Sequence, residues 1–332
     1  MPEIGFLLVL TIILALAFDY INGFHDTANA VATVVSTRVL SPRVAIILAA
    51  ILNFAGAMLA TQVAKTIASG IIVTHMATET VVLGAIVAAI AWNLLTWIYG
   101  IPSSSSHALI GGLVGAAIAH GGLNVVTWDG LLNKVVYPLV GSPLVGFIIG
   151  YSLMTAIAWI FSHSHPARAG RTFKTLQVVS SSLMAFSHGQ NDAQKSMGII
   201  TLTLVAHGFL KTPDVPLWVM VACALAMAMG TAAGGWRIMH TVGQKISRLD
   251  PVHGFAAETS SAAVILTAGH FGMPISTTQT ITASIFGVAS SRRLSAVRWK
   301  IAKNVIVAWF VTLPASALMG ALAYELFNLV WK

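Results

Sequence analysis

The fold is decided by residues 18–30, which read FDYINGFHDTANA and place charged and amide side chains inside an otherwise apolar segment. A second stretch, residues 186–195, reads FSHGQNDAQK and interrupts another apolar segment in the same way. Aligned at an offset of 166 residues, the two stretches share a glycine and an aspartate: Gly23 and Asp26 in the first, Gly189 and Asp192 in the second. Each stretch therefore places a carboxylate three residues after a glycine.

The rest of the chain is too apolar for a protein surrounded by water. Its 332 residues are 57% hydrophobic and only 8% charged, with a mean hydropathy of +0.84. Soluble chains carry about 25% charged residues, so the composition predicts a polytopic membrane protein and excludes a soluble enzyme or a disordered chain. The single cysteine, Cys223, excludes a disulfide framework and a metal cluster held by the chain's own thiolates.

The apolar segments are predicted to be helices, because a helix satisfies its own backbone hydrogen bonds in lipid and an open strand does not. The first segment runs directly into the polar stretch, so we expect it to be retained rather than removed as a signal peptide. The predicted segments are residues 4–36, 44–64, 80–100, 106–119, 131–162, 173–206, 217–239, 256–271, 275–290 and 303–330.

A second pair of elements recurs downstream. Residues 100–107 read GIPSSSSH, and residues 272–279 read GMPISTTQ at an offset of 172 residues. A weaker match places Pro143 on Pro314. Three matches in one order at nearly one offset indicate an internal duplication. The predicted halves are residues 1–162 and 163–332.

The basic residues predict how the halves are oriented. Four loops hold 13 of the 18 Lys and Arg residues, and loops rich in these residues face the cytoplasm. Both termini then lie outside the cell, provided that each Pro-Ser/Thr element forms a hairpin with the helix before it. The first half starts outside and the second inside, which is the inverted-repeat plan of secondary transporters. The predicted fold is an all-α polytopic membrane protein with broken first helices, re-entrant hairpins and about 10–12 membrane helices counting half-helices.

The two motif acids predict an ion or substrate pathway, because a carboxylate within a membrane span is costly. Asp26 and Asp192 recur in both halves, whereas Asp19 and Glu258 have no acidic counterpart. The Pro-Ser/Thr elements are polar helix starts, and a helix start offers free N–H donors to an oxyanion. An anion close to two carboxylates needs a positive partner from solution, which predicts coupling to Na⁺, H⁺ or a divalent metal.

At these residues the chain resembles the inorganic phosphate transporter family, through the duplicated motif at 22–30 and 187–192 and the repeated elements at 102–107 and 274–279. The resemblance extends over almost the whole chain and implies cation-coupled uptake of phosphate. The chain has His25 in the first motif and lacks a Glu near Asn53. In both features it resembles the family's bacterial proton-coupled subgroup, which carries phosphate with a divalent metal. The coupling cation, H⁺ or Na⁺, stays open. The resemblance implies no resident cofactor.

The candidate residues follow from the motifs and from the resemblance together. The residues assigned to phosphate are Ser104, Ser105, Ser106, Ser276, Thr277, Thr278 and Asn191. Those assigned to the coupling ion, with Na⁺ or Mg²⁺ considered beside the two acids, are Asp26, Asp192, Asn29, Asn22 and Gln194. Those assigned a proton or charge role are His25, His107, His188, Lys195 and Glu258.

Three other functions compete with that of a phosphate symporter. An intramembrane enzyme built on Ser106 and His107 is disfavoured, because adjacent helical residues do not face each other. A channel stays open, since inverted repeats also occur in channels. A sulfate carrier is less favoured than a carrier of a protonated oxyanion, which can donate to carboxylates; arsenate should behave like phosphate. We expect the protein to lie in the cytoplasmic membrane, in contact with lipid, and to bind inorganic phosphate. We expect no nucleic-acid partner, and a homodimer is a possible assembly.

Overall fold

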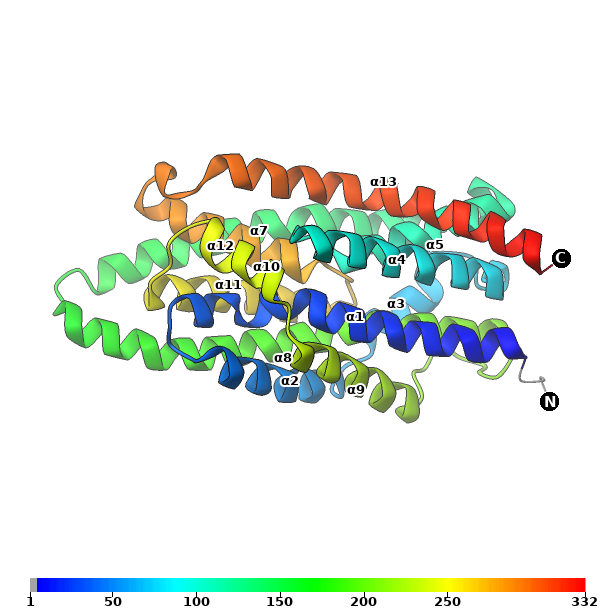
Figure 1. The fold of residues 1–332 in the computed structure, drawn as a ribbon, viewed down its shortest axis with the longest axis horizontal. Coiled ribbons are helices and arrows are strands. Elements are labelled where there is room, and N and C mark those ends of the chain that lie inside the picture. The colour runs from blue at the N-terminus through cyan, green and yellow to red at the C-terminus, as the bar shows by residue number, and fades with distance from the viewer. Residues whose placement is uncertain (1–4, 332) are drawn as a thin grey trace.

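The computed structural model describes residues 5–331, which form an elongated helical bundle (Figure 1). The first half contains α1 (Phe6–Ser36), α2 (Pro42–Ala57), α3 (Gln62–Gly70), α4 (Glu79–Tyr99), α5 (Ser105–Gly121), α6 (Trp128–Gly130) and α7 (Tyr137–Ile160). The second half contains α8 (Pro166–Ala206), α9 (Leu217–Ala233), α10 (Trp236–His240), α11 (Pro251–His270), α12 (Thr277–Arg292) and α13 (Trp299–Val330). These bounds match most of the predicted apolar segments, but the segments predicted at 44–64 and 217–239 each span parts of two helices. Residue 4 of the first predicted segment lies outside the described residues.

The halves repeat one order of elements: a long helix, a bent helix pair, a two-helix hairpin and a final long helix. Details recur as well, since the Trp128 indole donates to the Leu123 carbonyl at 3.0 Å and the Trp299 indole donates to the Leu294 carbonyl at 2.8 Å. Figure 1 shows that α1 and α8 start from opposite ends of the bundle. The all-helical, inverted arrangement is confirmed, whereas the repeat boundary at residues 162 and 163 stays a prediction.

Several helices are long and apolar enough to cross a membrane. Among the described residues, four helices meet that requirement by length and composition, and six do if each bent pair counts as one span. The start of α1 and the end of α13 lie at one end of the molecule, and the loops α1–α2, α7–α8 and α12–α13 lie at the other (Figure 1). We call these the terminal end and the loop end.

The helix breaks lie elsewhere than the sequence predicts. Both α1 and α8 run without interruption through the glycine–aspartate motifs, where we expected a break. The chain bends instead by 63° between α2 and α3 and by 61° between α9 and the α10 segment. The motif glycines serve close packing, because a Cβ atom at Gly23 would lie 2.5 Å from the Met227 carbonyl oxygen of α9. Small residues let membrane helices approach closely without unwinding.

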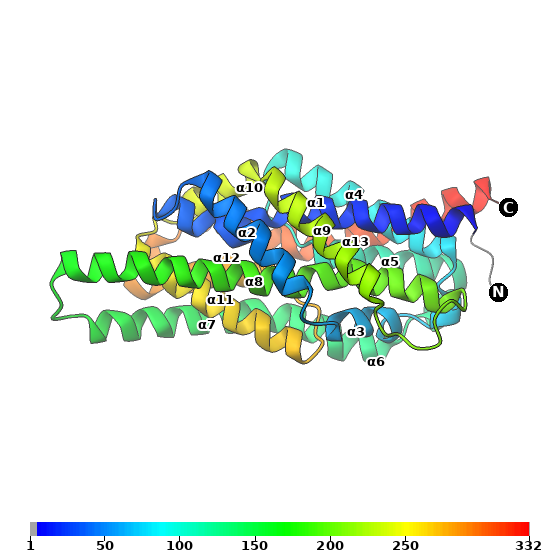
Figure 2. The same cartoon turned by 90° about the horizontal axis from the view of Figure 1, so that it is seen from below.

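Each motif helix packs against the bent pair of the other half. A Cβ at Gly189 of α8 would overlap the backbone of Asn53 in α2, and one at Gly56 of α2 would overlap the Phe186 carbonyl of α8. Figure 2 shows α2 and α9 crossing the long helices on one face of the bundle. This exchange joins the halves through backbone contacts that only glycine permits.

Two hairpins enter the bundle from opposite ends and meet in its middle. The first is α4–α5 and the second is α11–α12, and each turns through a glycine with positive φ, Gly100 at 63° and Gly272 at 66°. Their tips touch, since the Ser106 hydroxyl donates to the Ile275 carbonyl at 2.9 Å. The predicted re-entrant hairpins are therefore present, and both helix starts lie deep in the protein.

The apolar interior is divided in two by this polar middle. One buried cluster includes Phe18 and Ala193, and the other includes Ala28 and Ala185. Along α1 and along α8, the motif residues lie between a member of each cluster. The helices therefore carry a polar layer across the centre of the bundle, with an apolar cluster toward each end.

Candidate functional site

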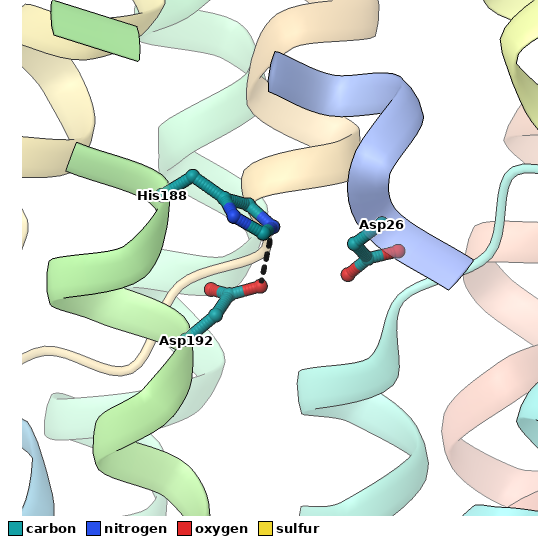
Figure 3. Close-up of side chains that lie close together, drawn as sticks. All are labelled: Asp26, His188 and Asp192. Atoms are coloured by element: carbon teal, nitrogen blue, oxygen red, sulfur yellow. Dashed lines mark ion pairs between the residues drawn. The ribbon is translucent and has the colours of Figure 1, made fainter. Parts of the chain in front are cut away.

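Asp26 of α1 and Asp192 of α8 face each other in the polar layer, with His188 beside them (Figure 3). One ligand atom from each of the three side chains lies within 4.8 Å of the others, and all three residues are buried. His188 and Asp192 are four residues apart on one helix face, and the His188 Nε2 atom lies 3.3 Å from the Asp192 Oδ2 atom. The predicted pair of acids is thus brought together from the two halves of the chain.

Asp26 is bound by donors from three elements. His25 Nδ1 lies 2.6 Å from its Oδ1 atom, the Thr278 hydroxyl donates to Oδ1 at 3.3 Å, and the Ser105 hydroxyl donates to Oδ2 at 3.3 Å. Ser105 begins α5 and Thr278 lies in the first turn of α12. Both hairpin tips therefore contact the same carboxylate.

Asp192 is paired with a lysine of its own helix. The Lys195 ammonium lies 2.6 Å from its Oδ1 atom, and both side chains are buried. The Thr277 hydroxyl donates to Oδ2 at 3.1 Å. Thr277 is the position equivalent to Ser105, so each acid accepts a hydrogen bond from the helix start of its own half.

Asn29 of α1 contacts the start of α12. Its amide donates to the Thr278 hydroxyl at 2.8 Å and to the Thr277 hydroxyl at 3.3 Å. Ser104 and Ser276 cap the two helices, because each accepts a hydrogen bond at 3.2 Å from the backbone N–H three residues later. The next residue in each helix, Ser105 or Thr277, donates to one of the two acids instead.

Polar residues outside the motifs orient the histidines, and the sequence analysis did not assign them. His25 Nε2 lies 3.0 Å from the Thr96 hydroxyl of α4, which also accepts a hydrogen bond from Ser103 at 2.8 Å. His188 Nδ1 lies 3.2 Å from the Asn53 side-chain oxygen of α2. In the sequence, Thr96 and Asn53 can be found as polar residues within apolar segments, where a polar side chain is costly and so indicates a functional or structural role.

Two of the assigned residues, Gln194 and His107, contact parts of the protein other than the two acids. The Gln194 side-chain oxygen accepts from the first N–H groups of α3, those of Val63 at 2.8 Å and Ala64 at 3.2 Å, and so caps the second segment of a bent pair. His107 contacts Gln279 at 3.1 Å, and both line an otherwise mostly apolar cavity of about 390 Å³ between α7 and α13. Within the described part of the chain, the hydrogen bonds of the Gln194 and His107 side chains go to groups other than the two acids.

Glu258 of α11 belongs to a separate cluster toward the loop end, which we call the Glu258 cluster. Its carboxylate accepts from Thr33 and Ser180, each at 2.5 Å, and from Gln177 at 3.1 Å. Thr37 donates to Gln177 at 2.9 Å. These hydrogen bonds tie α1, α8 and α11 together on one side of the acidic pair.

Two assigned asparagines lie in the polar layer without a hydrogen-bond partner among the described residues. They are Asn22 of α1 and Asn191 of α8, and both are fully buried. Buried amides are normally satisfied, so these groups are available to a ligand or water. Asp19, which has no acidic counterpart in the second half, is also buried without such a partner.

A fold with two inverted halves, hairpins meeting at its centre and buried acids between them defines a multi-pass membrane transport protein. The model of the phosphate transporter family matches residues 22–171 and 162–320. The chain belongs to this family, as the sequence motifs predict. It is therefore a transporter and not an enzyme.

Individual relatives agree over nearly full length. A "probable low-affinity inorganic phosphate transporter" of Bacillus subtilis (strain 168) is 48% identical over 98% of this chain and 98% of its own. A protein of the same description from Rhizobium meliloti (strain 1021) is 49% identical over 98% and 97%. Among solved structures, "the sodium-dependent phosphate transporter" superposes with a TM-score of 0.85 at 25% identity, covering 98% of this chain and 100% of that one.

Proposed function

We propose that the protein is a symporter that carries inorganic phosphate across the cell membrane together with a cation. The main support for the proposal is that three hydroxyl groups at the helix starts donate hydrogen bonds to the two acids. Ser105 and Thr278 donate to Asp26, and Thr277 donates to Asp192. Each hydroxyl has a single proton to donate, so it serves either a carboxylate or a bound oxyanion.

This competition couples the two ligands. When phosphate binds at the helix starts, the hydroxyls turn to the anion and the carboxylates lose donors. A buried carboxylate without donors is costly, so a cation that binds Asp26 and Asp192 becomes favourable at that moment. Phosphate and cation therefore bind more tightly together than either does alone.

The charge balance supports the same coupling. Asp26 and Asp192 carry two negative charges, and Lys195 supplies one fixed positive charge. Phosphate adds further negative charge in a buried site, where like charges repel by several kcal/mol. One or more cations must therefore enter with the anion.

The identity of the cation depends on two features of the site. Carboxylate and amide oxygens suit Na⁺ or a divalent metal such as Mg²⁺. His25 and His188 touch the acids directly and could hold a proton instead. A phosphate–metal complex would place the metal between the anion and the acids. Arsenate, with the same shape and protonation, is expected to be carried too.

The test is uptake of labelled phosphate into proteoliposomes. Uptake is measured at fixed pH with and without Na⁺, then at fixed Na⁺ with a pH gradient, each with and without Mg²⁺. Stimulation by one of these gradients supports the proposal and identifies the cation. Phosphate flux that follows only its own gradient, with a net current and without counterflow, would instead indicate a channel.

A pair of variants tests the hydroxyl competition. Thr277→Val removes a donor to Asp192, and we expect the KM for phosphate to rise roughly tenfold, the effect of about 1.4 kcal/mol. Thr282→Val is the matched control, because Thr282 is buried in the same helix and makes no hydrogen bond to a described residue. Equal behaviour of the two variants would remove the hydroxyl from the mechanism.

The predicted orientation, with both termini outside, belongs to this proposal. The loop end holds the loops that are rich in Lys and Arg, and such loops face the cytoplasm. A membrane-impermeant thiol reagent tests this on a cysteine placed in the α7–α8 loop, for example Ser164→Cys in a Cys223→Ser background. We expect labelling only after the membrane is permeabilised.

A further inference from the structure

Asp19 is a buried acid that the phosphate site does not use. It lies on α1 seven residues before Asp26, which is about 10 Å along a helix axis. Its side chain is fully buried, and neither carboxylate oxygen accepts a hydrogen bond from a described residue. The Ser196 hydroxyl of α8 and the Cys223 thiol of α9 lie beside it. Ser196 also lacks a hydrogen-bond partner in the described part of the chain.

No net positive charge compensates an ionised Asp19. The charged and titratable groups that act on it are Asp192 and Lys195 of α8, together with Cys223 of α9. Asp192 and Lys195 are paired with each other at 2.6 Å, so their fields at Asp19 largely cancel. A buried carboxylate that is neither paired nor hydrogen-bonded is strongly disfavoured relative to its neutral form.

The surroundings of Asp19 are apolar on the side away from the motif. Its neighbour Phe18, together with Cys223 and Met227, belongs to the buried cluster toward the terminal end. The equivalent position in the second half is Ala185. An alanine fills this position in one repeat, so the fold does not require a carboxyl group here.

We infer that Asp19 is the site that takes up and releases the transported proton, separate from the acids that face phosphate. This inference rests on the proposed symport. When the protein opens toward one side, the Asp19 carboxylate takes a proton from water and becomes a neutral carboxyl group. The protein closes around this neutral form, and the carboxyl group returns the proton to water after the opposite side opens. One proton then crosses with each phosphate.

The experiment compares Asp19→Asn with wild type in proteoliposomes, using labelled phosphate in two assays. Phosphate–phosphate exchange at equal pH needs no net proton movement, so we expect Asp19→Asn to retain it. A gradient of one pH unit drives a coupled proton by about 1.4 kcal/mol, which gives about tenfold phosphate accumulation. We expect Asp19→Asn to lose this tenfold accumulation. The ionisation of phosphate itself is the same in both preparations, so the difference isolates the protein's proton.

Asp129→Asn serves as the matched control, because Asp129 is an exposed acid outside the site and should behave as wild type in both assays. Tenfold accumulation by Asp19→Asn would overturn the inference. So would loss of exchange by folded Asp19→Asn, since Asp19 would then act in carrying phosphate. Loss of Na⁺-driven accumulation, with pH-driven accumulation kept, would make Asp19 a Na⁺ ligand and also contradict it.

Asp19→Ser is the second variant if Asp19→Asn does not fold; failure of both to fold would make Asp19 structural and overturn the inference. The proposed function fails in a different way. In that case wild-type protein itself accumulates no phosphate under any cation gradient.

Discussion

The two halves place equivalent helices around two equivalent acids, yet they surround those acids with different charges. Asp192 is paired with Lys195, whereas the equivalent position near Asp26 is Asn29. Asp26 contacts His25 instead, where the second half has Asn191. The backbone is therefore nearly symmetric and the electrostatics are not. The two acids are therefore chemically distinct, although the helices that carry them are equivalent.

The same contrast extends to the packing on the two sides of the site. Toward the loop end, the Glu258 cluster ties three helices together with hydrogen bonds. The positions equivalent to Glu258, Thr33 and Ser180 in the other half are Ile86, Ile199 and Leu14, which pack in the apolar cluster toward the terminal end. One side of the site is closed by polar contacts and the other by apolar packing.

The largest effect should come from removing either motif acid. Asp26→Asn and Asp192→Asn each remove a carboxylate from the proposed cation site, and we expect phosphate uptake to fall by roughly 100-fold or more, the effect of about 3 kcal/mol. The two variants should differ in stability. Only Asp192→Asn leaves a buried ammonium, that of Lys195, without a counter-charge, so only it should lower the melting temperature clearly. Wild-type uptake by either variant would remove that acid from the mechanism.

The second prediction moves the positive charge from one half to the other. Lys195→Asn should destabilise the protein by about 3 kcal/mol, because it leaves the buried Asp192 charge unpaired. Adding Asn29→Lys supplies an ammonium at the equivalent position beside Asp26. If the halves are interchangeable in charge, the double variant regains stability and some uptake. Recovery of stability without any uptake would show that the location of the charge, and not its presence, matters for transport.

The third prediction tests the reciprocal glycine contacts. Gly189→Ala places a Cβ against the Asn53 backbone, and we expect a loss of stability of about 2 kcal/mol from overpacking. Gly23→Ala should cost a similar amount, since its Cβ would meet the α9 backbone. Gly141→Ala is the control, because nothing lies within 4 Å of its Cβ position. Thermal unfolding in detergent measures all three, and an unchanged melting temperature for Gly189→Ala would contradict the packing.

The fourth prediction concerns a variant in which the Glu258 cluster becomes apolar, like the equivalent positions in the other half. Glu258→Leu leaves Thr33, Ser180 and Gln177 without their shared acceptor, which should weaken closure at the loop end by about 1–2 kcal/mol. A cysteine introduced as Ser181→Cys in a Cys223→Ser background then reports opening through its rate of thiol labelling. We expect faster labelling in Glu258→Leu than in the parent. Slower or unchanged labelling would show that the cluster does not hold this side closed.

Much of this arrangement could be predicted from the sequence, because its signals are strong in a membrane. An acid within an apolar segment must face the protein interior, so the pairing of Asp26 with Asp192 followed from the duplication. The hairpins followed from Pro and Ser at helix starts. The position of the helix breaks did not, because a glycine such as Gly23 is equally compatible with unwinding and with close packing. Only the neighbouring helix decides between these uses.

The roles of Gln194 and Glu258 could not be predicted for a related reason. Their sequence neighbours do not identify their partners, which lie on other helices: α3 for Gln194, and α1 and α8 for Glu258. Residue type shows that a buried polar side chain needs a partner. The identity of that partner depends on helix packing, which is set by contacts far apart in the chain.

The smallest effect on stability should come from breaking an exposed ion pair whose charged atoms are as close as those of the buried Lys195–Asp192 pair. Lys65 and Asp214 lie 2.6 Å apart at the protein surface, the same distance as Lys195 and Asp192 in the interior. The hydrogen bond from Lys65, assisted by Thr212, holds the pKa of Asp214 below its ordinary value of 3.8. Any stability from this pair is therefore present above that value and is lost as the pH falls through the lowered pKa. Because water screens both exposed groups, Lys65→Met should leave the melting temperature and its pH dependence unchanged within error. A loss comparable to that of Lys195→Asn would contradict the view that burial, rather than distance, sets the strength of these pairs.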